Sequence, residues 1–152
     1  MYRLNFKSWK QSNFEGFILL KGVVVRLKSA QKDYLAAEKD GSIISTERSN
    51  FRKVFWMIYN VPDSSNEIRL KNLATRRWLT KSKDSADTFA SQLLLEDDSI
   101  WIVRGKIADN QEIMLKSAKG EFLHRCDSIW CDITTWHTGL GNAWTVEVVR
   151  EY

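Results

Sequence analysis

Cysteine, histidine and proline are scarce in this chain, which has two cysteines, two histidines and one proline among its 152 residues. Two cysteines cannot build the interlocked disulfide framework that braces small secreted scaffolds. A single small-loop bridge between Cys126 and Cys131 is one alternative, but two free thiols in a reducing compartment are the simpler interpretation. Together with His124 and His137 these residues match no standard zinc spacing, so we expect no metal site.

Long apolar runs are also absent. Residues 17–20 are the only apolar stretch near the start, and Lys21 ends it, so it is too short for a signal peptide or a membrane span. We therefore expect a cytoplasmic protein without a membrane partner.

Catalytic motifs are missing as well. The chain has no phosphate-binding glycine loop, no Gly-x-Ser-x-Gly elbow and no dinucleotide fingerprint. The carboxylates at positions 96–98 are typical of a solvated turn, and two histidines leave few general bases. These features predict a protein that is not an enzyme and that needs no cofactor.

The composition is that of a soluble single domain, with 43% hydrophobic and 28% charged residues. The net charge of +4 is compatible with an acidic partner without requiring one. A charge this modest does not favour nucleic-acid binding, because the basic patch of a nucleic-acid reader is usually stronger.

A short motif occurs three times. Residues 25–29 (VRLKS), 68–72 (IRLKN) and 113–117 (IMLKS) recur at intervals of about 44 residues, and this spacing indicates an internal repeat. Two further landmarks keep the same interval, an aromatic–leucine pair and a tryptophan that opens an apolar run. They are Tyr34–Leu35, Trp78–Leu79 and Phe122–Leu123, and Trp56, Trp101 and Trp144.

The repeat predicts strands. Apolar and polar residues alternate through each copy of the motif, as they do in a half-buried strand, and turn-forming residues separate the short runs. Propellers typically need at least four blades, whereas three units of four strands fit a β-trefoil. We therefore predict an all-β protein with a β-trefoil domain of three pseudo-symmetric units at residues 21–152. Residues 1–20 would form an N-terminal arm or an added strand.

The same pattern predicts the core. The leucines of the motif should fill the barrel, and the leucines of the aromatic pairs should close its hairpin end. The three repeated tryptophans should fill the opposite end, where large rings bury much apolar area.

With the repeats aligned, the chain resembles fascin-like trefoils. It is more closely similar to a plant family of uncharacterised domains that are related to actin cross-linking proteins. The motif at residues 25–29, the following residues 33–37 (DYLAA) and the final residues 143–149 (AWTVEVV) carry this resemblance. It covers roughly residues 21–150, and most of these positions are core or turn residues. It implies a non-enzymatic module that binds a protein partner, with actin filaments as the candidate. Fascin-type bundlers link several trefoils, whereas this chain holds one.

Basic residues at equivalent positions form the first candidate binding site. An acidic filament surface would attract them, although outward lysines also simply keep a barrel soluble. The candidates are Lys28, Lys71, Lys116, Arg26, Arg69, Arg76 and Arg77.

Two aromatics lie outside the repeated positions and form the second candidate site. Trp130 and Trp136 fall in the less regular part of the third unit, and exposed aromatics beside polar residues often mark binding surfaces. Packing beneath the local loop is the alternative interpretation.

A lectin-like module that binds carbohydrate is the alternative function. Trefoil lectins often use an aspartate in each unit, and Asp40, Asp84 and Asp127 follow the aromatic strands at similar distances. The same aspartates are typical of hairpin turns, and the glutamine-x-tryptophan signature of ricin-type lectins is missing. A trefoil protease inhibitor is disfavoured, because no extended reactive loop is evident.

Overall fold

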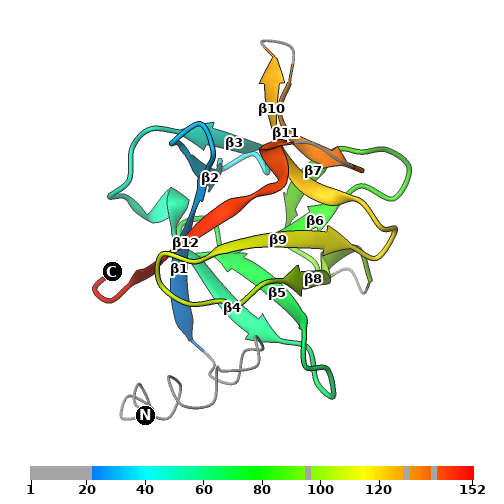
Figure 1. Ribbon diagram of the computed structural model, residues 1–152, viewed down its shortest axis with the longest axis horizontal. Coiled ribbons are helices and arrows are strands. Elements are labelled where there is room, and N and C mark those ends of the chain that lie inside the picture. Colours follow the sequence, from blue (N-terminus) through cyan, green and yellow to red (C-terminus); the bar gives the residue numbers. More distant parts are fainter. Residues whose placement is uncertain (1–21, 95–96, 129–130, 138–139) are drawn as a thin grey trace.

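The computed structural model of the chain describes residues 22–94, 97–128, 131–137 and 140–152 (Figure 1). Twelve β-strands and three short 3₁₀ segments make up the regular structure of these residues, without an α-helix among them. The all-β prediction is therefore confirmed. The arm expected at residues 1–20 lies outside the described residues. No helix in the described ranges has the length and apolar character that crossing a membrane requires.

Six of the strands close into an antiparallel barrel. Going round it, each strand is hydrogen-bonded to the next, and the last returns to the first, so none of the six has a free edge. In that order they are β1 (Val23–Ser29), β4 (Trp56–Asn60), β5 (Glu67–Asn72), β8 (Trp101–Arg104), β9 (Glu112–Ser117) and β12 (Trp144–Val149).

The other six strands form three hairpins, which contact one another on one side of the barrel (Figure 1). The hairpins are β2 (Tyr34–Ala37) with β3 (Ile43–Thr46), β6 (Trp78–Lys81) with β7 (Thr88–Ser91), and β10 (Phe122–Ser128) with β11 (Cys131–Trp136). The 3₁₀ segments η2 (Arg52–Val54), η3 (Asp97–Ser99) and η4 (Leu140–Asn142) lead into β4, β8 and β12.

The repeated apolar residues form one continuous core, as predicted. The position predicted for the tryptophans is wrong, because they lie at the hairpin end of the barrel and not at the opposite end. All of the repeated residues are buried because the alternation of each strand turns them inward, while neighbours such as Arg26 and Lys28 keep part of their surface in water. The repeated members of this core are Leu27, Leu70, Leu115, Leu35, Leu79, Leu123, Trp56, Trp101 and Trp144.

The three buried tryptophans also make one polar contact each. Their indole N–H groups donate hydrogen bonds of 3.0–3.1 Å to the carbonyl oxygens of Leu35, Leu79 and Leu123. An indole N–H buried without a partner would destabilise the fold, so this contact permits a large ring inside the barrel. It also ties each of β4, β8 and β12 to the first strand of a hairpin.

The last residue of each motif closes the turn between barrel and hairpin. The Ser29 hydroxyl accepts a hydrogen bond from the Gln31 amide, and the Asn72 side chain accepts from the amides of Ala74 and Thr75. Ser117 accepts from Lys119 and Glu121 in the same way. A buried polar residue ends each motif because it satisfies the turn's backbone amides.

Cys126 and Cys131 are joined by a disulfide bond, so the prediction of two free thiols is wrong. The chain folds back between β10 and β11, where Ser128 is paired with Cys131 after an irregularity in the register. This brings the two Cα atoms to 5.6 Å, within the range that a disulfide spans. The expectation of a reducing compartment rests on free thiols, so the disulfide removes its basis. A cytoplasmic location therefore stays a prediction.

Replacing Trp101 with phenylalanine tests the role of the indole hydrogen bond. Trp101→Phe leaves the Leu79 carbonyl without its partner and opens a small cavity, so we expect a loss of about 2–3 kcal/mol in unfolding free energy. Urea unfolding measures the change. Trp136→Phe is the matched control, because that ring is 54% exposed and its replacement should change stability by less than about 0.5 kcal/mol. Equal stability of Trp101→Phe and the native protein would show that the buried contact is dispensable.

Candidate functional site

The three motif lysines lie opposite the aromatic residues of the hairpins. The register pairs Lys28 with Tyr34, Lys71 with Trp78 and Lys116 with Phe122 across neighbouring strands. The ammonium group is 5.9 Å from the ring centre for the first pair and 5.2 Å for the second, within cation–π range. Both partners recur in the sequence, but the cross-strand register that joins them does not follow from the repeat alone.

Most of the predicted basic residues are engaged within the protein. Glu147 lies 3.0 Å from Arg26 and 4.0 Å from Lys28, and it accepts a hydrogen bond of 3.0 Å from the Tyr34 hydroxyl. Burial, followed by this contact with Glu147, raises the pKa of Tyr34 above its ordinary value. Arg69 donates a hydrogen bond to the Ser99 hydroxyl.

The motif lysines do not form one row. They lie on β1, β5 and β9, and no two of these strands are hydrogen-bonded neighbours. Arg76 is exposed at a tight turn with a positive φ of 61°, and its amide donates to the Asn72 carbonyl. Arg77, in contrast, lines a groove.

This groove has a volume of about 570 Å³ and lies between the β2–β3 turn and strand β7. The two walls are joined where the Ala90 amide donates to the Gly41 carbonyl at 2.7 Å and Ser42 pairs with Phe89. Polar and apolar groups share the lining, including Asp40, Ser42, Arg77, Phe89, Gln92 and Leu93. The rim continues into two strongly exposed leucines, since Leu93 is 68% and Leu94 49% exposed.

Trp136 is exposed on β11, whereas Trp130 lies outside the described residues. The Trp136 ring centre is 6.5 Å from those of both His124 and His137. His137 lies 3.6 Å from the carboxylate of Glu121. This surface therefore presents an aromatic ring beside imidazole groups and a carboxylate.

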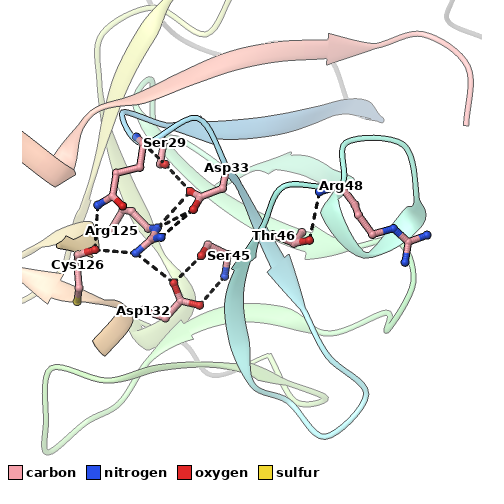
Figure 2. Close-up of polar contacts among 9 residues, drawn as sticks. Ser29, Asp33, Ser45, Thr46, Arg48, Arg125, Cys126 and Asp132 are labelled. Atoms are coloured by element: carbon pink, nitrogen blue, oxygen red, sulfur yellow. Dashed lines mark hydrogen bonds and ion pairs between the residues drawn. The ribbon is translucent and has the colours of Figure 1, made fainter. Parts of the chain in front are cut away.

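Arg125 forms the centre of a polar network between two hairpins (Figure 2). Its guanidinium contacts both carboxylate oxygens of Asp33, with the shortest distance at 2.8 Å, and lies 3.4 Å from Asp132. Asp132 in turn accepts hydrogen bonds from the amide and hydroxyl of Ser45. The sequence does not reveal this network, because Asp33 and Arg125 are 92 residues apart in the chain and no repeated pattern links them.

The network changes the acidity of its members. Burial by itself would raise the pKa of the Asp33 carboxyl, but hydrogen bonds from Arg125 and Ser29 and the charge of Arg125 hold that pKa below its ordinary value of 3.8. The hydrogen bond with Asp33 raises the pKa of Arg125. Asp33 and Arg125 therefore form a charged pair, with side chains only 11% and 16% exposed.

One turn aspartate and both histidines have structural contacts. Asp40 accepts a hydrogen bond from the Ser42 amide, which is the turn-forming role, and the His124 ring bonds the Asn142 side chain at 2.8 Å. Within the described part of the chain, no three His, Cys, Asp or Glu residues are grouped so as to hold a metal ion.

Comparison with known proteins agrees with this architecture. A family model described as "Beta-trefoil domain of unknown function (DUF569)" matches residues 17–89. The fold is a β-trefoil. The Arabidopsis thaliana SDF2-like protein superposes with a TM-score of 0.72 at 14% identity, over 85% of this chain and 94% of that protein. A Caenorhabditis elegans protein of unknown function gives 0.71 at 16% identity, over 87% and 96%.

At these identities the two solved structures share the fold of this chain and do not assign it a function. No curated protein matches the chain in sequence.

Asp33→Asn tests the charged pair through its pH dependence. A carboxyl whose pKa is depressed on folding stabilises the protein above the unfolded value of 3.8, and the contribution disappears as pH falls through the folded value. At neutral pH we expect Asp33→Asn to lower the unfolding free energy by about 2–3 kcal/mol. The difference from the native protein should shrink below pH 3.8.

Urea titrations at several pH values measure both effects. Asp84→Asn is the control, because Asp84 is exposed in the β6–β7 loop and should show neither. A stability difference that stays constant down to the lowest pH would refute the depressed pKa of Asp33.

Proposed function

We propose that this protein is a non-enzymatic β-trefoil module that binds a protein partner, with actin filaments as the candidate. Its three units of about 44 residues would be related by pseudo-threefold symmetry. The binding surface would be the groove between the β2–β3 turn and β7, together with the leucines on its rim.

The pair of exposed leucines carries this proposal. A soluble domain rarely leaves two adjacent large aliphatic side chains in water without a reason, and Leu93 and Leu94 are 68% and 49% exposed. Aliphatic side chains beside a charged groove suit a protein surface, because burying each leucine against a partner contributes about 1.5 kcal/mol or more. Arg77 in the same groove would attract an acidic partner.

The resemblance to fascin-like trefoils names the partner. Its supporting residues, at 25–29, 33–37 and 143–149, are mostly core and turn positions, so they support the fold more strongly than the ligand. Cross-linking two filaments needs two sites. A single trefoil that used this groove alone would bind along a filament without bundling it, and such a role would place the protein in the cytoplasm.

Sedimentation with actin filaments tests the proposal. At low salt we expect the full chain to pellet with filaments at high speed and not at low speed, where only bundles sediment. The double change Leu93→Ser/Leu94→Ser should weaken binding by roughly 10-fold or more, because both apolar contacts are lost.

Leu93→Met/Leu94→Met is the matched control, since it keeps apolar side chains of similar volume and should retain binding. Failure of the native protein to pellet at low salt would eliminate actin as the partner. Equal pelleting of the serine and methionine variants would show that Leu93 and Leu94 are not part of the binding site.

Carbohydrate binding is the second candidate function, and Trp136 favours it. Its ring is 54% exposed, and His137 and Glu121 lie beside it, so a sugar could stack on the ring and hydrogen-bond at its edge.

A glycan array with the native protein and two variants tests this candidate. We expect Trp136→Ala to lose at least about 10-fold in affinity for any glycan bound, because stacking on the ring is removed. Trp136→Tyr keeps an aromatic surface and serves as control. An array without bound glycans would exclude the lectin function, and glycan binding unchanged in Trp136→Ala would exclude this surface.

A further inference from the structure

Two positions recur in every unit, and at two of the three junctions between neighbouring hairpins the side chains at these positions meet. The first is the residue just before the aromatic–leucine pair of one unit. The second is the residue two places after the paired leucine in the preceding unit, where the third unit is taken to precede the first. At the three junctions the two positions hold Asp33 with Arg125, Glu121 with Lys81, and Arg77 with Ala37.

Two of these junctions contain an ion pair. Arg125 on β10 lies 2.8 Å from Asp33, and Lys81 on β6 lies 3.8 Å from Glu121. The basic side chains are 16% and 8% exposed, and Lys81 also donates hydrogen bonds to the carbonyls of Ser82 and Ser85. In each case the residue before the aromatic–leucine pair is acidic, and its carboxylate forms an ion pair with a basic side chain of the neighbouring hairpin.

The third junction has the opposite chemistry. By sequence position, Arg77 replaces the carboxylate, and Ala37, whose side chain is fully buried, replaces the cation. The Arg77 guanidinium forms no ion pair or hydrogen bond with any described residue. It lies against the backbone of Gly41, where an added Cβ would stand 3.0 Å from Nη1.

The groove opens at this junction. Arg77 and Asp40 both line it, and no ion pair joins these two described side chains. Hydrogen bonds from Ser42 are the main cause of the lowered pKa of Asp40, and the charge of Arg77 adds to it. The Asp40 carboxylate is therefore hydrogen-bonded within its own turn. The hydrogen-bond donors of the Arg77 guanidinium are available to a ligand.

We propose that Arg77 anchors the carboxylate of an aspartate or glutamate of the protein partner, an inference that rests on the proposed function. The ligand would complete the ion pair that this junction lacks. A guanidinium binds a carboxylate through two parallel hydrogen bonds, and Phe89 and Leu93 would contact apolar residues beside the acidic one. Asp40 would repel a dianionic phosphate more strongly than a single carboxylate, so the carboxylate of a protein fits the groove better.

Titration with blocked peptides tests this anchor in the full chain. The probe is a leucine–glutamate–leucine peptide with capped ends, and its glutamine counterpart has the same shape without the charge. We expect the glutamate peptide to shift the NMR signals of Gly41, Phe89 and the Arg77 side chain, and to bind at least 10-fold more tightly than the glutamine peptide.

Two arginine variants separate the anchor from general charge. Arg77→Gln should lose the preference for glutamate, while Arg76→Gln removes the same charge from the neighbouring exposed position and should keep it. Equal binding of both peptides to the native protein, or an unchanged preference in Arg77→Gln, would overturn the proposal.

A third variant rebuilds the missing pair. Ala37→Lys/Arg77→Glu would give this junction the residue types of the other two, so it should abolish peptide binding and unfold at a higher temperature than Arg77→Glu alone. Because Ala37 is fully buried, Arg77→Gln remains the deciding variant if the double variant does not fold.

Filament sedimentation of Arg77→Gln separates this proposal from the proposed function. Pelleting of the native protein and of Arg77→Gln to the same extent would retain actin binding and overturn the anchor. Glutamate-selective peptide binding that depends on Arg77, without pelleting of the native protein, would support the anchor and remove actin as the partner.

Discussion

Three buried indole rings determine how this trefoil is assembled. Trp56, Trp101 and Trp144 are fully buried, and each donates its N–H to a leucine carbonyl at the start of a hairpin. The ring supplies apolar area to the barrel, and the hydrogen bond sets the position of the hairpin relative to the strand. The hairpins can therefore vary at their outer residues, because their inner ends are already held.

That freedom is visible at the hairpin junctions. An arginine pair and a lysine pair close two of them, whereas the equivalent positions of the third hold Arg77 and Ala37, and Arg77 lines a groove. The charged pairs are shielded from water, so removing one partner would leave a costly unpaired charge. Arg77 avoids that cost because the groove is open and its guanidinium can be hydrated. The same openness makes it accessible to a ligand.

The predicted basic residues illustrate how local patterns can mislead about sites. Lys28 and Lys71 recur because each lies over an aromatic ring, and Arg26 is paired with Glu147. Their recurrence therefore has a structural reason that is independent of a partner. Of the seven basic candidates, Arg77 is the one that lines the groove, and this placement comes from the packing of two hairpins rather than from the repeated motif.

Periodicity by itself determined the strands, the barrel residues and the buried tryptophans, because alternation and a fixed interval require only short-range information. The tertiary structure decided the rest. The Asp33–Arg125 pair joins residues that are 92 positions apart in the chain. The disulfide depends on how the β10–β11 hairpin folds back. The groove that Arg77 lines lies between the β2–β3 turn and β7, and it forms only where these two hairpins pack together. Contacts of this kind depend on register and on hairpin packing, neither of which a single sequence specifies.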